Sequence, residues 1–396
     1  MHDFDKKTNR YDTNSLKWDG LKEKYGREDL IPLWVADMDF QVSPSIVKSL
    51  QERIKHPIYG YMYCSDEYYE AIIRWMKRRH SWEVEREWIV FTPGVVSALS
   101  YAIRAFTKPG DNIIIQSPVY HPFYSTIENN KRNVITNPLI YRNDTYYMDY
   151  KDLERKIDSK TKLLLLCSPH NPIGRVWTKE ELSKLGEICL RNNIIIISDE
   201  VHFDLVYKGY GHTVMANVSP DIRENCIICT SPSKTFNIAG LQISNIIIPN
   251  NELRKRYTEE LEKDHIVRPN VFGQGALIAA YDESEEWLDS LMRYLEENKN
   301  FFIDFIETRI PKLKVVKPEG TYLLWVDCSE LNMNSEELKE FFLNKCRLAL
   351  NHGEIFGEEG KLFQRFNIAC PRTVLEEVLL RIEKAIKDEI SGLMNN

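Results

Sequence analysis

Lys234 is a candidate for covalent chemistry with a carbonyl group. It follows an apolar run and lies among the hydroxyl residues Ser231, Ser233 and Thr235, with no acidic residue beside it. A lysine that attacks a carbonyl group must present a neutral amine, and burial or neighbouring cations favour that state. A lysine after a strand is also commonly a solvated surface residue, so the interpretation depends on the residues that accompany it.

Asp199 ends an isoleucine-rich run and precedes Lys234 by 35 residues. A carboxylate in this position can face the pyridine nitrogen of pyridoxal phosphate (PLP) and keep it protonated, the state in which the ring accepts electrons from a substrate carbanion. The simpler alternative is an aspartate that caps the following turn. The spacing favours the cofactor role, with Lys234 forming a Schiff base to PLP, and predicts an enzyme of amino-acid metabolism.

Three further side chains could complete such a site. Asn171 could donate a hydrogen bond to the phenolic oxygen of the cofactor, although an Asn-Pro-x-Gly segment is by itself a turn. Tyr120 could stack on the ring or simply cover the core. Arg365 is the preferred partner for a substrate α-carboxylate, because a guanidinium binds both carboxylate oxygens. Arg372 is the less favoured choice, and a surface ion pair is the alternative for either arginine.

A phosphate-binding element is suggested by residues 92–99, where a Pro-Gly turn precedes an apolar helical stretch. The free amide groups and the dipole of a helix N-terminus bind anions. Gly94, Val95 and Val96 are therefore the candidate phosphate ligands.

The candidate residues follow short apolar runs that alternate with stretches of helical composition. This pattern is typical of βαβ units with a mostly parallel sheet, and the unbroken apolarity predicts strands covered on both faces. The runs span residues 112–115, 163–166, 193–197, 226–229 and 245–248. Ligands bind outside the carboxyl ends of such strands. We therefore expect Tyr120, Asn171, Asp199 and Lys234 to converge at one edge of the sheet.

The C-terminal third has a different pattern, with a helix predicted over 285–308, a strand over 321–326 and a final helix over 374–387. A capping box at Thr178 predicts a further helix to about residue 190. The expected fold class is α/β, with a three-layer α/β/α large domain built on a mostly parallel mixed sheet at residues 51–284. A smaller α+β domain is expected at 285–396, joined by an N-terminal segment, residues 1–50.

Composition excludes several function classes. The net charge of -7 argues against a dedicated partner of nucleic acid or anionic membrane, since either needs a cationic surface. No apolar run approaches the length of a membrane span, and the N-terminus lacks a signal-like stretch, which predicts a cytoplasmic protein. The eight cysteines are scattered in apolar runs, and Cys226 and Cys229 lack the second ligand pair of a metal site, so no metal is expected.

In combination these segments resemble the fold-type I PLP-dependent enzymes, the class I/II aminotransferase superfamily, and most closely its cystathionine β-lyase-like MalY/PatB branch, which includes cystalysin. The resemblance runs in order along almost the whole chain. It is carried by residues 34–40, 92–96, 168–177, 198–204, 231–241 and 365–372. It implies the fold-type I transferase fold, PLP as cofactor, and the same cofactor and substrate roles for Lys234, Asp199, Asn171, Tyr120 and Arg365.

The resemblance also implies roles that the local sequence does not suggest. Tyr61 would reach the cofactor phosphate of the neighbouring subunit, which implies a homodimer with two shared sites. Ser231 and Ser233 would offer hydroxyl groups to the phosphate, and Ala36 would contact the substrate. His202 occupies the position, three residues after the aspartate, where aminotransferases usually have tyrosine.

Two positions depart from the pattern of the branch. His121 stands where cystalysin has a second tyrosine, which puts any proton transfer by that residue in doubt. Glu354 stands where relatives often have an aromatic residue. We therefore expect a different preference for the substrate side chain.

The implied reaction is α,β-elimination from L-cystathionine or S-substituted cysteines, giving pyruvate, ammonia and a thiol. Lys234 would be the general base, and the implied catalytic residues are Lys234, Tyr120 and Tyr61. An aminotransferase, which uses the same residues, is the first alternative. A regulatory protein that binds a transcription activator, as one member of the branch does, is the second.

Overall fold

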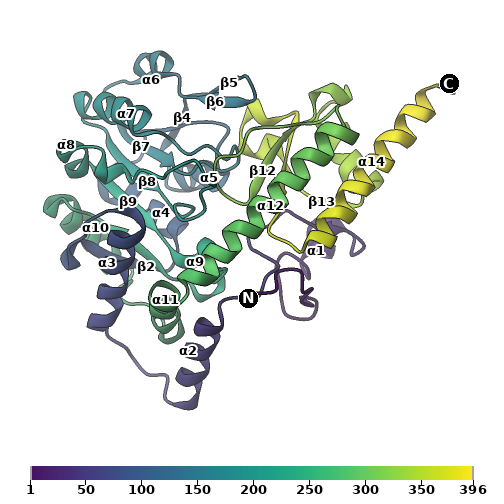
Figure 1. Ribbon diagram of the computed structural model, residues 1–396. Coiled ribbons are helices and arrows are strands. Elements are labelled where there is room, and N and C mark those ends of the chain that lie inside the picture. The colour runs from purple at the N-terminus through teal and green to yellow at the C-terminus, as the bar shows by residue number, and fades with distance from the viewer. Residues whose placement is uncertain (1, 395–396) are drawn as a thin grey trace.

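A seven-stranded sheet forms the centre of the molecule (Figure 1), and the computed structural model describes residues 2–394. The strand order is β2-β10-β9-β8-β7-β3-β4. Only β10 in this sheet runs antiparallel to its neighbours. The strands are β2 (Ile89–Thr92), β3 (Asn112–Ile115), β4 (Asn133–Thr136), β7 (Thr161–Cys167), β8 (Ile195–Asp199), β9 (Cys226–Thr230) and β10 (Ser244–Ile247). The predicted mostly parallel mixed sheet is confirmed.

All five predicted apolar runs overlap strands of this sheet. β7 begins two residues before its predicted run, and β8 begins and ends two residues later than predicted. Asn193 adopts a left-handed backbone conformation with φ of 54°, which a strand cannot include. This residue closes the turn between the preceding helix and β8.

Helices bury both faces of the sheet. Because successive residues of a strand point to opposite faces, each strand contributes side chains to two cores. Ile113 and Ile115 of β3 join one core and Ile114 joins the other. The first core includes residues of α4 (Val95–Phe106), α5 (Pro122–Asn129) and α10 (Asn251–Lys263). The second includes residues of α3 (Asp66–His80), α7 (Lys179–Arg191) and α11 (Val271–Glu283). The three-layer arrangement is confirmed.

The predicted capping box opens α7. The Thr178 hydroxyl accepts a hydrogen bond from the backbone N–H of Glu181, and the Glu181 carboxylate accepts one from the backbone N–H of Thr178. Two helix N–H groups that would otherwise lack partners are satisfied in this way.

The C-terminal part forms a second, antiparallel sheet beside two long helices (Figure 1). Its strand order is β11-β12-β15-β14, with β11 (Lys314–Val315), β12 (Leu323–Asp327), β14 (Asn351–His352) and β15 (Phe363–Asn367). The helices are α12 (Glu285–Arg309) and α14 (Arg372–Met394), close to their predicted positions. Near the N-terminus, β1 (Ile31–Pro32) pairs in parallel with β13 (Leu348–Ala349).

The division into domains stays a prediction. The expected boundary at residue 50 falls inside α2 (Pro44–Lys55), whereas the one at 284/285 falls at the junction of α11 and α12. The remaining elements are α1 (Leu21–Tyr25), β5 (Ile140–Arg142), β6 (Thr145–Tyr147), α6 (Tyr150–Lys156), α8 (Pro220–Glu224), α9 (Pro232–Thr235) and α13 (Ser335–Glu340). Among residues 2–394, none of the helices combines the length and apolarity needed to cross a membrane.

Gly353 provides a test of the packing in the C-terminal part. A Cβ atom on Gly353 would overlap the carbonyl oxygen of Gly360 and lie 2.6 Å from that of Phe363. Because both obstacles are backbone atoms, we expect Gly353→Ala to lower the free energy of unfolding by about 2–3 kcal/mol in a urea titration. The control is Gly211→Ala, because a Cβ there meets no atom within 4 Å. Equal urea midpoints for the two variants would contradict this packing.

Candidate active site

The residues predicted at the strand ends line one cavity of about 240 Å³. Tyr120 follows β3, Asn171 follows β7, Asp199 ends β8 and Lys234 follows β9. The lining also contains Ala36, Pro93, Gly94, Val95, Val96, Ser97, Cys167, Val201, His202, Ser231, Ser233, Ala239, Gln242 and Ile243. The predicted convergence at one edge of the sheet is therefore found, as expected for an open α/β sheet.

Lys234 lies on the short helix α9, half-buried, with its amine facing a carbonyl group. Its Nζ donates a hydrogen bond of 2.8 Å to the backbone oxygen of Ala36. Burial lowers the pKa of Lys234 to about 8, with the positive charge of Arg365 acting in the same direction and the carboxylates of Asp37 and Asp199 opposing it. A pKa near 8 leaves a useful fraction of neutral amine at physiological pH, as a nucleophile or base requires.

Asp199 lies at the bottom of the same cavity, almost fully buried. Burial raises the pKa of its carboxyl group to about 7, although the backbone N–H of Val201, which donates to Oδ1 over 3.2 Å, and the charge of Lys234 act against this shift. A buried carboxylate is costly without a cationic partner. A protonated ring nitrogen placed beside Asp199 would supply that partner and favour the ionised form.

Arg365 and Asn171 form a direct link between the two sheets. Arg365 lies on β15, is 2% exposed, and donates from Nη1 to the Asn171 side-chain oxygen at 3.0 Å and from Nη2 to the Trp34 carbonyl at 2.7 Å. Its Nε is buried and has no hydrogen-bond partner within the described chain. Burial lowers the pKa of Arg365 to about 10, which still leaves it charged. A buried guanidinium with a free donor is suited to a carboxylate ligand.

Arg372, the less favoured candidate, lies elsewhere. Its Nε donates to the Asn298 side-chain oxygen at 2.7 Å, and its guanidinium lies over the ring of Phe301. Neither arginine lines the cavity itself, but Arg365 contacts Asn171 of the cavity wall. The geometry therefore favours Arg365 of the two.

Tyr120 and His202 lie on the cavity wall with shifted pKa values. Burial raises the pKa of Tyr120. Burial also holds the pKa of His202 well below its usual range, and the charges of Lys234 and Arg365 add to this effect. The imidazole is therefore neutral, and its buried Nδ1 has no partner among residues 2–394. An unpaired buried nitrogen is costly unless a ligand or water meets it.

The N-terminus of α4 forms one end of the cavity. The first N–H groups of a helix lack intrahelical partners, and the N-cap residue Gly94 has no side chain that could bind those of α4. Val95, Val96 and Ser97 follow along the cavity wall. This arrangement of free amides and helix dipole fits a phosphate group.

The hydroxyl groups of Ser231 and Ser233 are not equivalent. The Ser231 hydroxyl donates to the Ile243 carbonyl at 2.6 Å and accepts from the Ser233 backbone N–H at 3.1 Å, which caps α9. Ser233 is half-buried on the cavity wall. The role of both serines as phosphate ligands stays a prediction.

Sequence reasoning missed two polar residues of the cavity, Ser97 and Gln242. Gln242 has a left-handed backbone conformation with φ of 49°, and Ser97 lies in the first turn of α4. Ser97 could have been found, because it lies within the predicted phosphate-binding element, residues 92–99, directly after the candidate ligands. Nothing in the sequence around Gln242 marks it.

Of the predicted site residues, Tyr61 and Arg365 do not line the cavity, and only Tyr61 also makes no hydrogen bond with a lining residue. Its side chain is fully exposed within the single chain and lines none of the cavity. Its predicted contact is with the neighbouring subunit, so this role stays a prediction.

The two positions that depart from the related branch differ in their surroundings. Glu354 accepts a hydrogen bond of 2.6 Å from the Ser335 hydroxyl, whereas Phe356 of the same stretch lies 5.1 Å from the Arg365 guanidinium. The ring of His121 contacts those of Tyr120 and Phe356, with centroid separations of 5.3 and 6.0 Å. His121, unlike Glu354, therefore lies beside the candidate substrate-binding residues.

Comparison with known proteins places this geometry in a family. The profile of class I and II aminotransferases matches residues 28–382. The chain belongs to the class I and II aminotransferase family. Within that family it is 43% identical to cystathionine beta-lyase PatB of Bacillus subtilis strain 168, over 97% of this chain and 99% of the relative.

Two solved structures of the family superpose closely. Cystalysin from Treponema denticola, which contains pyridoxal 5'-phosphate, has a TM-score of 0.95 and 39% identity over 98% of this chain and 99% of that one. A PLP-bound protein from Clostridium difficile 630, described provisionally as an aminotransferase, has a TM-score of 0.96 and 47% identity over 98% and 100%. The predicted family, its cystathionine β-lyase-like branch and its fold are confirmed.

His121 provides a test of the electrostatics of the site. Burial and the positive charges of Arg365 and Lys24 lower its pKa to about 4. We therefore expect its imidazole to stay neutral from about pH 5.5 to 8, measured as unchanged ring nitrogen shifts in NMR spectra, with the signal assigned by comparison with His121→Asn. A titration midpoint near the ordinary value of about 6.5 would contradict this account.

Proposed function

We propose that this chain is a PLP-dependent carbon–sulfur β-lyase that cleaves L-cystathionine or S-substituted cysteines to pyruvate, ammonia and a thiol. The observation that carries the proposal is one cavity lined by an amine of lowered pKa and a buried carboxylate, with a buried arginine that has a free donor bound to Asn171 of the cavity wall. The identity to PatB and the likeness to cystalysin support this chemistry over other PLP reactions.

The cavity residues fit PLP at each of its polar groups. Lys234 would hold the aldehyde carbon, and Asp199 would pair with the ring nitrogen, which resolves the cost of burying its carboxylate. Asn171 and the neutral imidazole of His202 would face the phenolic oxygen, giving the unpaired His202 Nδ1 a partner. Tyr120 would cover the ring face.

The phosphate would occupy the N-terminus of α4, where Gly94, Val95 and Val96 offer free amides. Ser97, Ser233 and Gln242 lie on the same wall and could add side-chain donors. A dianionic phosphate at this position is stabilised by the helix dipole as well as by the hydrogen bonds.

Substrate binding is assigned to Arg365 and to the segment around Ala36. Arg365 would bind the α-carboxylate through its fork of donors, which fixes the Cα–H bond relative to Lys234. Lys234, once its amine is free, would take the Cα proton as general base, a role that a pKa near 8 suits.

PLP supplies an electron sink that stabilises the negative charge left at Cα. The electron pair from the Cα–H bond forms the Cα–Cβ double bond as the Cβ–S bond breaks, and the sulfur leaves with its bonding electrons and takes up a proton. The released three-carbon enamine takes up water to give pyruvate and ammonia. Neither oxidant nor reductant is needed.

Transamination is the second candidate, because the chain belongs to the aminotransferase family and resembles a protein described provisionally in those terms. Both reactions begin with removal of the Cα proton. They differ in the next step, since transamination returns a proton to the cofactor and requires a keto-acid acceptor.

The product distinguishes the two candidates. We expect the purified PLP-loaded enzyme to release pyruvate from L-cystathionine without any keto acid, measured with lactate dehydrogenase and NADH. Lys234→Ala should lose this activity and also the visible absorbance of lysine-bound PLP, whereas the control Gly211→Ala, at a residue that does not line the cavity, should keep both. Consumption of L-cystathionine only when a keto acid is added, with conversion of that keto acid to its amino acid and no pyruvate released from the substrate, would assign the enzyme to transamination.

We further propose a homodimer whose two sites are shared, acting in the cytoplasm. The exposure of Tyr61 beside the exposed Ile58, Tyr59 and Tyr63 supports a partner surface, and the eight unbridged cysteines fit a reducing compartment. In such a dimer Tyr61 would reach the phosphate bound by the partner.

Sharing of the sites is tested by mixing two inactive variants. Tyr61→Ala and Lys234→Ala subunits, unfolded and refolded together, form heterodimers in which one site carries both changes and the other carries neither. Random association makes about half of the dimers mixed, each with one intact site, so about a quarter of wild-type activity should return. If Tyr61 acts within its own subunit, the mixture stays inactive.

A further inference from the structure

Residues 34–40, which we call the strap, form an irregular segment that reaches the cavity at Ala36. Its backbone carbonyls face the candidate catalytic groups. The Trp34 carbonyl accepts from Arg365 at 2.7 Å, and the Ala36 carbonyl accepts from both the Lys234 amine at 2.8 Å and the Tyr322 hydroxyl at 2.9 Å. The position of the strap therefore affects the two groups that handle substrate.

Two asparagine side chains hold the strap from the protein side. Asn367 Nδ2 donates to the carbonyls of Val35 and Asp37, at 2.7 and 2.6 Å. The Asn237 amide accepts from the Met38 N–H and donates to the Met38 and Phe40 carbonyls. Asn237 lies three residues after Lys234, so the segment that carries the lysine also binds the strap.

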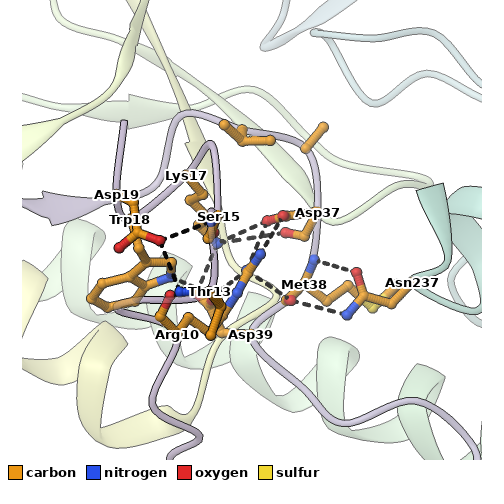
Figure 2. A network of polar contacts seen from close by, with 12 residues as sticks. Arg10, Thr13, Ser15, Lys17, Trp18, Asp19, Asp37, Met38, Asp39 and Asn237 are labelled. Atoms are coloured by element: carbon orange, nitrogen blue, oxygen red, sulfur yellow. Dashed lines mark hydrogen bonds and ion pairs between the residues drawn. The ribbon is translucent and has the colours of Figure 1, made fainter. Parts of the chain in front are cut away.

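A cluster of four charged side chains holds the strap from the other side (Figure 2). Arg10 binds Asp37 with both terminal nitrogens, at 3.1 and 2.7 Å, and reaches Asp39 at 2.7 Å. Lys17 lies 2.8 Å from Asp39 and 3.6 Å from Asp37. The two cations and two carboxylates balance in charge, and the proposed reaction gives none of them a role.

Burial makes this cluster expensive to break. The Lys17 side chain is 0% exposed, and that of Asp39 is 7% exposed. Although burial would raise the pKa of Asp39, Lys17, Trp18 and Arg10 hold it below its usual range. Removing one partner from a buried ion pair leaves an uncompensated charge. The ion pairs of the cluster therefore hold Asp37 and Asp39 of the strap in place.

The loop that carries Arg10 and Lys17 is itself ordered by a carboxylate. Asp19 accepts hydrogen bonds from the backbone N–H groups of Asp12, Thr13 and Ser15, at 2.9 to 3.1 Å. The adjacent Trp18 donates from its indole nitrogen to Asp39 at 2.9 Å (Figure 2). The N-terminal residues therefore reach the strap as a shaped loop rather than as a free tail.

We propose that the Arg10–Lys17–Asp37–Asp39 cluster is a positioning device for the catalytic lysine: it fixes the Ala36 carbonyl as the acceptor for the Lys234 amine and sets how much of the Asp37 charge the lysine experiences. This inference rests on the proposed role of Lys234. Arg10 and Asp37 are positioning residues, since neither lines the cavity.

The direction in which each neighbouring charge shifts the pKa of Lys234 is defined. The Asp37 carboxylate raises the pKa of Lys234, and Arg365 lowers it, while Asp199 acts in the same direction as Asp37. Neutral His202 and the hydroxyls of Tyr120 and Tyr322 also lie around the cavity. Arg10, paired with Asp37, partly cancels its charge. Removing the Asp37 charge should therefore weaken proton binding at the Lys234 nitrogen, and removing Arg10 should strengthen it.

The test compares Asp37→Asn with Arg10→Gln in the PLP-loaded enzyme. Both break the same ion pair, but their charge changes are opposite. The readout is the pH midpoint at which the visible absorbance of bound PLP changes, which reports the proton on the Lys234 nitrogen. We expect Asp37→Asn to move the midpoint down by about 0.5–1 pH unit and Arg10→Gln to move it up by a similar amount. The pH profile of kcat/KM should move with it.

The matched control is Glu383→Gln, which removes a carboxylate paired with Arg309 between α12 and α14, far from the strap, and should leave the midpoint unchanged. Shifts in the same direction for both variants, or no shift in either, would overturn the proposal. If Asp37→Asn does not fold, the upward shift in Arg10→Gln decides alone. A wild-type protein with no visible PLP band would instead contradict the proposed function.

Discussion

Helices cover both faces of the seven-stranded sheet, and the rest of the molecule depends on this double burial. A buried strand has no room for unpaired polar side chains, so polar residues collect beyond the strand ends. Tyr120, Asn171, Asp199 and Lys234 all lie there. The same burial desolvates them, which raises the pKa of Asp199 and lowers that of Lys234. The burial of the sheet therefore accounts both for where these polar residues lie and for the shifts in their pKa values.

The second sheet contributes Arg365, the candidate ligand for the substrate carboxylate. Arg365 extends from β15 to Asn171, so the edge of the parallel sheet and the antiparallel sheet are joined by one buried guanidinium. Binding a carboxylate at this junction would couple substrate binding to the relative position of the two sheets. An anion that meets Arg365 would also satisfy its unpaired Nε.

The N-terminal residues are part of the same machinery, although they contain none of the catalytic groups. Their buried ion pairs hold the strap, and the strap presents carbonyls to Arg365, Lys234 and Tyr322. Buried ion pairs seldom add stability over an apolar core, but they hold defined geometry. The strap lies within hydrogen-bonding distance of the candidate catalytic lysine, where such defined geometry is useful.

The sequence by itself determined five strands of the central sheet, the cap of α7 and the types of residue at the strand ends, because these follow from local apolar patterns and from a rule about strand ends that applies to every open α/β sheet. The likeness of several ordered segments to a known family then gave the cofactor and reaction. Only the tertiary structure decided the contacts between Ala36 and Lys234, 198 residues apart, and between Trp34 and Arg365, 331 apart.

Gln242, Tyr322 and the Arg10–Asp37 pair also escaped sequence reasoning, because no local pattern marks a residue whose partners come from distant parts of the chain. The sizes of the pKa shifts could not be predicted from the sequence for the same reason. The residue types near Lys234 predicted a lowered pKa, but how far it falls depends on how completely the folded chain removes water and on where Asp37, Asp199 and Arg365 come to lie.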